Sequence, residues 1–181
     1  MDSSDTKNIR HLVQSYGPLD FREKVYKEQM LGFIEHSQNH FDRANKLGHF
    51  TASALVTNND LSKYLLMHHK KLNRWLQLGG HCDGDNDVVK VALKESEEES
   101  GIDGFKLYSK KIFDLDIHFI PANKVEVAHY HFDCRFLLIA RDTMVKKNKE
   151  SNKLEWFDLK DSIYPTDNLS IIRMLDKLQK L

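Results

Sequence analysis

The chain has 181 residues, of which 40% are hydrophobic and 30% are charged, so it can bury an ordinary core. Lys and Arg together number 27, as do Asp and Glu, and a balanced chain has no global charge to attract nucleic acid or an anionic membrane. With only two cysteines and no long apolar stretch, we expect one domain over residues 1–181, located in the cytoplasm, without nucleic-acid or membrane partners.

Two helices are predicted near the N-terminus, over residues 6–16 and 20–36. In the first, apolar residues recur at helical spacing up to the break at Gly17-Pro18. In the second, Asp20 followed by Glu23 is typical of a capping box. The apolar residues of the second helix spread around its axis, so we expect the domain or a second subunit to cover it. A homodimer is therefore one expectation.

A core at residues 48–181 is expected to follow this helical extension, which spans residues 1–40. Apolar and polar residues alternate through 49–58, which predicts a strand. A hairpin strand returns over 63–68 after a turn, and a further extended segment leads to the glycine pair Gly79-Gly80.

Three glutamates lie on the helix that is predicted between Asp87 and Gly101. Glu95, Glu98 and Glu99 are three and four residues apart, which brings their side chains onto one stripe. Ionised carboxylates so close repel one another, and Mg²⁺ or Mn²⁺ would neutralise them, since both prefer carboxylate oxygens. The alternative is a solvated acidic face, the usual reading of an acidic helix.

The segment from Gly80 to Ile102 resembles the signature of the Nudix hydrolases, G-x5-E-x7-R-E-U-x-E-E-x-G-U, in which U is a bulky aliphatic residue. The spacing is kept without a gap. The residues that match the signature are Gly80, Glu95, Glu98, Glu99, Gly101 and Ile102.

Three positions depart from this signature. Asn86 replaces its first glutamate, Lys94 its arginine and Ser96 its first aliphatic residue. In the family, that glutamate and that arginine are mostly a structural pair, so we interpret their joint loss as a coupled change. Asp85 or Asp87 could still reach Lys94. The departures also give weight to another class of function, a Nudix-like domain that binds a nucleotide without hydrolysing it.

The resemblance implies an α/β fold, an α/β/α sandwich around a mixed, curved sheet. It implies metal-dependent hydrolysis of a diphosphate linkage in a nucleoside diphosphate derivative, with Mg²⁺ or Mn²⁺ as cofactor. The implied metal ligands are Glu95, Glu98 and Glu99 with the carbonyl of Gly79. One of these glutamates can act as general base, but the family often takes its base from elsewhere. Glu126 is a candidate for that role, although a solvated loop residue is the simpler interpretation.

Two later strands each carry a polar row opposite an apolar row. In residues 105–120 the row is Asp114, Asp116 and His118, and in residues 128–140 it is His129, His131, Asp133 and Arg135. One such row is usually a solvent face, but two rows in the interior of one sheet also fit a substrate cleft. A separate zinc site is a further possibility, against which stands the lack of compact ligand spacing.

Several side chains are candidates for binding the substrate, and surface or structural roles remain equally open for them. They are Arg43, Arg74, His81, His129, His131 and Arg135. The residues do not choose among a nucleoside diphosphate sugar, ADP-ribose and a nucleoside triphosphate.

The chain closes with a strand over 154–159 and a helix that starts at residues 165–167. A last rival function is the isomerisation of an isoprenoid diphosphate, which a relative of this fold performs with a cysteine and a glutamate. Cys82, next to His81, faintly suggests that chemistry, whereas the preserved hydrolase spacing opposes it.

Overall fold

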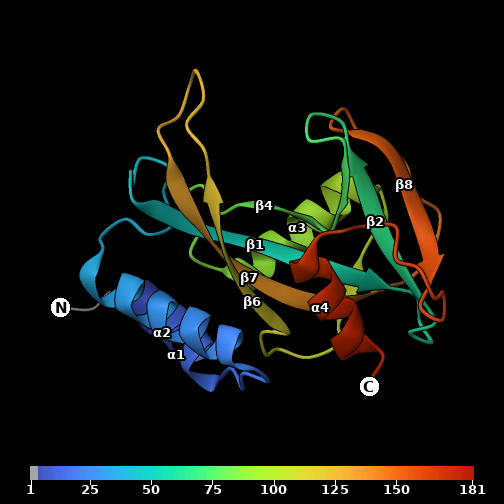
Figure 1. Ribbon diagram of the computed structural model, residues 1–181, viewed down its shortest axis with the longest axis horizontal. Helices are drawn as coiled ribbons and strands as arrows, with labels where there is room; N and C mark the ends of the chain where they lie inside the picture. Colours follow the sequence, from blue (N-terminus) through green and yellow to red (C-terminus); the bar gives the residue numbers. More distant parts are fainter. Residues whose placement is uncertain (1–3) are drawn as a thin grey trace.

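The computed structural model describes residues 4–181, so the first three residues of the predicted extension lie outside the described part of the chain. Its elements are α1 (Ser4–Ser15), α2 (Phe21–His36), β1 (Gly48–Thr57), β2 (Lys63–His69), β3 (Arg74–Leu76), β4 (Leu78–His81), α3 (Val88–Ser100), β5 (Phe105–Leu107), β6 (Asp114–Ile120), β7 (His129–Ala140), β8 (Ser151–Asp158) and α4 (Leu169–Leu178). The strands form one curved, mixed sheet with helices on both faces, the α/β architecture that the sequence predicts (Figure 1).

Strand β1 is the centre of the sheet. It pairs in parallel with β7 along its whole length, from Gly48 opposite Tyr130 to Thr57 opposite Ile139. On its other side β1 pairs first with β4, over residues 51–54, and then with β2 only at its last two residues. The neighbours of β1 therefore diverge along this edge, and the backbone leaves room there for side chains from several strands.

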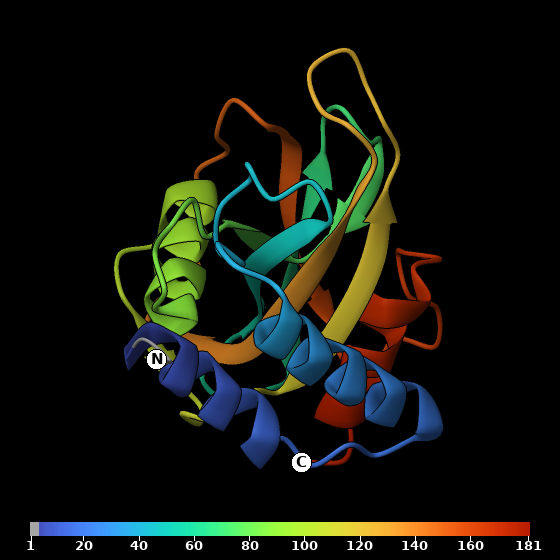
Figure 2. The same ribbon diagram turned by 90° about the vertical axis from the view of Figure 1, so that its left-hand side faces the viewer.

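Two apolar cores lie on opposite faces of the sheet. Phe50, Ala52 and their alternating neighbours on β1 pack with α1, α2 and α3. Leu55 and Leu137 point the other way and pack with the apolar side of α4. Figure 2 shows α3 and α4 on opposite sides of the strands, with α1 and α2 below them. The polar rows of β6 and β7 lie on the same face of the sheet as α4, because successive side chains alternate.

The first turn of α2 joins the extension to the rest of the chain. Asp20 accepts a hydrogen bond from the Glu23 amide at 2.8 Å, as the predicted cap requires. The Glu23 carboxylate is buried, however, and its Oε1 lies 2.7 Å from Lys177 Nζ of α4. A residue expected to serve only its own helix thus also ties α2 to α4.

Among the boundaries that differ from the sequence prediction, two change the path of the chain. Residues 105–120 form two strands, because β5 pairs with the C-terminal end of β7 and β6 pairs with its N-terminal part, so the chain loops out between them. Helix α4 begins at Leu169, where the Asn168 side chain accepts from the Ser170 amide, and not at residues 165–167.

Candidate active site

Helix α3 presents the three glutamates in the way that its local sequence predicts. Asp87 caps its first turn by accepting from the Lys90 amide at 3.0 Å, and Gly101 ends it in the left-handed conformation, with φ of 67°. Small and aliphatic side chains bury one side of the helix against the sheet; among them are Val88, Ala92 and Ser96. The glutamates border this packed side.

Two glycines of β4 allow the carboxylates to lie against the strand. The Gly79 amide donates to Glu99 Oε2 at 2.9 Å. A Cβ atom added at Gly80 would lie 2.5 Å from Oε2 of Glu95, so a larger residue there would force the Glu95 carboxylate to move. The glycine pair therefore holds Glu95 and Glu99 in one cradle.

Glu99, the buried member of this cradle, has no cationic partner among residues 4–181. Glu99 is only 7% exposed, and burial raises its pKa to about 8 although the Gly79 amide opposes the shift. Burial also raises the pKa of Glu95. Glu98 is exposed to solvent. A buried carboxyl without a cationic partner is a group that a bound cation would ionise.

Among residues 4–181, Lys94 is the cation that forms ion pairs with these glutamates, and it lies at the exposed rim. Its Nζ is 3.4 Å from Glu95 Oε1 and 3.6 Å from Glu98 Oε1. Asp85, which was expected to reach Lys94, pairs instead with Lys90 at 2.8 Å. The expected replacement for the signature's structural pair is therefore wrong: Lys94 turns toward the carboxylate stripe, because Lys90 lies closer to the loop.

A polar cleft of about 430 Å³ opens beside the cradle. Its walls include Arg43, His81, Glu95, Glu99, His131 and Asp133, which come from four separate segments. Arg43 is paired with Asp83, with 2.7 Å between Nη2 and Oδ2. Of the side chains expected to bind substrate, the structure thus brings Arg43, His81 and His131 to the same cleft as the glutamates.

The expected histidines gather around one that sequence reasoning missed, His49 of β1. Nε2 of His131 lies 3.2 Å from Nε2 of His81 and 3.2 Å from Nε2 of His129. The ring of His49 is stacked on that of His129, with centroids 5.0 Å apart. No sequence motif marks His49; it joins the others because parallel pairing sets it opposite His131.

Arg135 lies outside the cleft, in a buried ionic cluster. Its guanidinium contacts Asp133 at 2.7 Å, Asp116 at 3.1 Å and Asp114 at 3.4 Å, and its side chain is 2% exposed. Arg173 and Lys177 of α4 contact Asp114 from the other side. The polar rows expected to form a substrate cleft are therefore divided: His118, His131 and Asp133 line the cleft, whereas Asp114, Asp116 and Arg135 are enclosed under α4. His129 contacts His131 but does not line the cleft.

Two further candidates do not line the cleft. Arg74 lies at a separate surface hollow, with Nη2 4.0 Å from the exposed Asp167. Glu126 is partly exposed in the 121–128 loop, which projects from the sheet (Figure 1), where its amide donates to the Asn123 side chain at 3.1 Å. Its charge is near enough to raise the pKa of His81, whose net shift is nevertheless downward because of burial.

The Cys82 thiol is buried in the apolar core, 3% exposed, and is not part of the cleft wall. Burial raises its pKa, so the thiolate is disfavoured. The structure therefore gives no support to isomerase chemistry that uses this cysteine.

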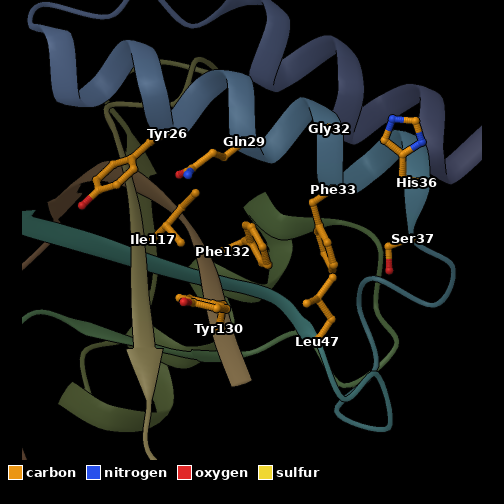
Figure 3. Close-up of a pocket in the computed structure, with 10 residues that line it drawn as sticks. All are labelled: Tyr26, Gln29, Gly32, Phe33, His36, Ser37, Leu47, Ile117, Tyr130 and Phe132. Atoms are coloured by element: carbon orange, nitrogen blue, oxygen red, sulfur yellow. The ribbon is translucent and has the colours of Figure 1, made fainter. Parts of the chain in front are cut away.

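A second, apolar pocket of about 590 Å³ lies between α2 and the sheet (Figure 3). Phe33 of α2 stacks on Phe132 at a centroid distance of 4.0 Å, and Tyr130 and Ile117 point into the same space. These strand residues alternate with His131 and His118, so they face away from the cleft. The pocket wall contains no carboxylate, and none of the three glutamates lines it.

Residues 48–178 match the family model of the NUDIX domain. A NUDIX-family hydrolase from Clostridium perfringens has a similar structure, with a TM-score of 0.55 and 23% identity over 73% of this chain and 97% of that one. An Ap4A hydrolase from C. elegans, in a binary complex, gives 0.54 and 19% over 72% and 95%. The E. coli dihydroneopterin triphosphate pyrophosphohydrolase gives 0.55 and 14% over 71% and 92%. At these sequence identities, the structural similarity supports the fold alone. Among residues 4–181, no helix is long and apolar enough to cross a membrane.

Proposed function

Because this chain belongs to the NUDIX family, and is thus a pyrophosphohydrolase of phosphorus-containing acid anhydrides, we propose that it hydrolyses the diphosphate linkage of a nucleoside diphosphate derivative with the help of a divalent metal. The observation that carries this proposal is the cradle of Glu95 and Glu99 against Gly79 and Gly80 at a polar cleft. The buried Glu99 has no cationic partner among the described residues, and a bound metal ion would supply that positive charge. The same ion would allow the anionic polyphosphate to approach the carboxylates.

Mg²⁺, which Mn²⁺ can replace, fits the donors of this cradle. Glu95, Glu98 and Glu99 supply carboxylate oxygens, and the Gly79 carbonyl is the proposed fourth protein ligand. The raised pKa of Glu99 supports this assignment, because a cation would offset the cost of burying its charge. When bound, the ion screens the phosphate oxygens and acidifies water.

The side chains of the chain itself have separate roles in this proposal. Glu99 must lose its proton to serve, and Glu98 must leave Lys94, which lies 3.6 Å away. We assign Glu98 as the first candidate for the general base, since it is the exposed member of the stripe. Glu126 remains the alternative, with the 121–128 loop carrying it to the substrate. Arg43 would bind a phosphate oxygen by exchanging Asp83 for it.

We propose a small nucleotide-like molecule as the substrate and the cytoplasm as the location. Both cysteines, Cys82 and Cys134, are buried and unpaired, which suits a reducing compartment. The structural neighbours include an Ap4A hydrolase and a dihydroneopterin triphosphate pyrophosphohydrolase. They suggest that dinucleoside polyphosphates and pterin triphosphates be added to the candidate substrates.

A phosphate-release screen tests the proposal. Nucleoside diphosphate sugars, dinucleoside polyphosphates, ADP-ribose and nucleoside triphosphates are offered with Mg²⁺ or Mn²⁺, and the Glu98→Gln variant is the blank. We expect metal-dependent release by the natural chain alone. If no compound is hydrolysed while a nucleotide still raises the melting temperature, the protein is a binding module and the hydrolase proposal is wrong.

A further inference from the structure

Four histidines from three neighbouring strands meet beside the cleft, and two of them, His81 and His131, line it. His49 lies on β1, His81 on β4, and His129 and His131 on β7. The pairing explains the meeting: His49 is opposite His131 in the parallel β1–β7 ladder, and His81 is opposite the next residue but one on β1, Thr51. Because side chains two apart share a face, all four project to the same side.

Three of these histidines have ring nitrogens spaced as ligands around one ion are. His49, His129 and His131 each offer a nitrogen within 4.8 Å of the other two, and this is the only group of three or more potential metal ligands so arranged among the described residues. The Nε2 atoms of His81 and His129 each lie 3.2 Å from Nε2 of His131. A tetrahedral zinc that binds nitrogens at about 2.05 Å separates them by about 3.3 Å.

Hydrogen bonding within the chain does not account for this arrangement. Nδ1 of His129 is 2.8 Å from the Val127 carbonyl and donates its proton there, so Nε2 carries no proton and its lone pair is free to bind. One proton on Nε2 of His131 can then satisfy one of its two contacts, but not both in good geometry. His49 is 1% exposed, and neither of its ring nitrogens has a hydrogen-bond partner among residues 4–181.

Unpaired buried polar atoms are rare and costly, and here they converge. We propose that His49, His129 and His131 form a binding site for a divalent first-row transition metal, which His81 completes by a shift of its ring, with Zn²⁺ as the best fit, distinct from the carboxylate site of α3. This site is not needed for the proposed hydrolysis and does not rest on it.

The chemistry of the cluster favours such an ion over Mg²⁺. Imidazole nitrogens suit Zn²⁺, Co²⁺, Ni²⁺ and Cu²⁺, whereas Mg²⁺ requires oxygen ligands. Burial lowers the pKa of His49 to about 4, with the charges of His81 and His129 adding to the effect, so the ring is neutral and ready to bind at pH 7. At His81, burial and the charge of Arg43 outweigh the negative charges of Asp83 and Glu126 and lower the pKa, so this ring is also neutral at pH 7. The Val127 carbonyl orients His129, as an outer partner does for a metal-bound imidazole.

Titration of the full chain with Co²⁺ after removal of metals by a chelator tests the site. Tetrahedral Co²⁺ has strong visible absorption, whereas octahedral Co²⁺ on carboxylates and water is pale. We expect one Co²⁺ per chain with the strong band, and its displacement by Zn²⁺. In His49→Gln and His129→Gln the band should disappear and the affinity fall by at least about 100-fold. In His129→Cys a thiolate replaces the imidazole, so the band should persist with a new sulfur-to-cobalt transition in the near ultraviolet.

Two matched variants separate this site from its surroundings. His118→Gln removes a neighbouring cleft histidine that pairs with Asp116 and lies outside the ligand set, and we expect the band to remain. Glu98→Gln should abolish hydrolysis and leave the band unchanged, so the two proposals fail independently. The site is refuted if the natural chain gives no tetrahedral band, or if the band survives in both His49→Gln and His129→Gln. Loss of the band in His118→Gln or Glu98→Gln would overturn the ligand set.

Discussion

Two buried carboxylates in this molecule have opposite properties. Glu99 of α3 has a pKa raised to about 8, because burial is opposed only by one backbone amide. Asp116 of β6 is also buried, and burial alone would raise its pKa, but the guanidinium of Arg135, together with His118 and Arg173, brings that pKa below its usual range. Among residues 4–181, no cation pairs with Glu99, whereas several surround Asp116.

The difference separates structure from function. A carboxylate whose partners all come from its own chain is part of the scaffold, as Asp116 is under α4. A buried carboxyl at a cleft, without such a partner, has a place for a cation from outside. The same contrast distinguishes Arg135, enclosed by three aspartates, from Arg43, which is held by one exposed acid that a substrate phosphate can replace.

The largest expected effect is on the stripe itself. Glu98→Gln keeps the size of the side chain and removes its charge, so the protein should fold normally while kcat falls by about 10² to 10⁴. Steady-state kinetics on the substrate found by the screen measures the loss, with circular dichroism as the check on folding. Near-normal turnover would remove Glu98 from the site.

The ionic cluster should respond in stability instead. Arg135→Met leaves Asp114, Asp116 and Asp133 without their shared cation, and the free energy of unfolding should fall by about 3–5 kcal/mol. Urea denaturation measures it. The matched control is Arg43→Met, whose exposed pair with Asp83 contributes at most about 1 kcal/mol, so its effect should appear in KM. A stable Arg135→Met variant with a raised KM would mean that Arg135 binds the substrate.

The pH dependence of metal binding follows from the raised pKa of Glu99. Below about 8 this carboxyl holds a proton in the metal-free protein, and the proton must leave before a metal binds. Mn²⁺ affinity should therefore rise with pH, by up to about tenfold per unit below pH 8, and level off above it. Calorimetric titration between pH 6 and 9 gives the profile. Glu99→Gln should bind more weakly with a flatter curve, and an equally steep curve would assign the proton to another group.

The smallest effect concerns Lys94, the exposed competitor of the metal. Lys94→Gln removes contacts with Glu95 and Glu98 that a metal must displace, and Mn²⁺ should bind about two- to fivefold more tightly. The same titration at pH 8 measures the change. Lys90→Gln is the control, since its partner is Asp85, outside the stripe. Weaker binding in Lys94→Gln would mean that Lys94 holds the glutamates in position for the metal.

Much of the carboxylate site could be predicted from the sequence because its determinants are local. The cap at Asp87, the stop at Gly101 and the spacing of Glu95, Glu98 and Glu99 all act within one helix, and the structure has them as predicted. Gly80 was matched to the first glycine of the signature, and the structure adds that a Cβ atom there would displace the Glu95 carboxylate.

The rest depended on contacts between distant segments. Asp133 and Arg135 are two residues apart on one face of β7, and both are buried. Asp133 nevertheless lines the cleft, whereas Arg135 is enclosed under α4, because α4 covers only part of that face. Likewise, His49 carries no motif and becomes a potential ligand only through the parallel pairing of β1 with β7. Periodicity and spacing therefore determined the helices, most strands and the glutamate stripe. Which polar residues meet, and which are enclosed, was decided by strand register and by the placement of α4, since these contacts join residues far apart in the chain.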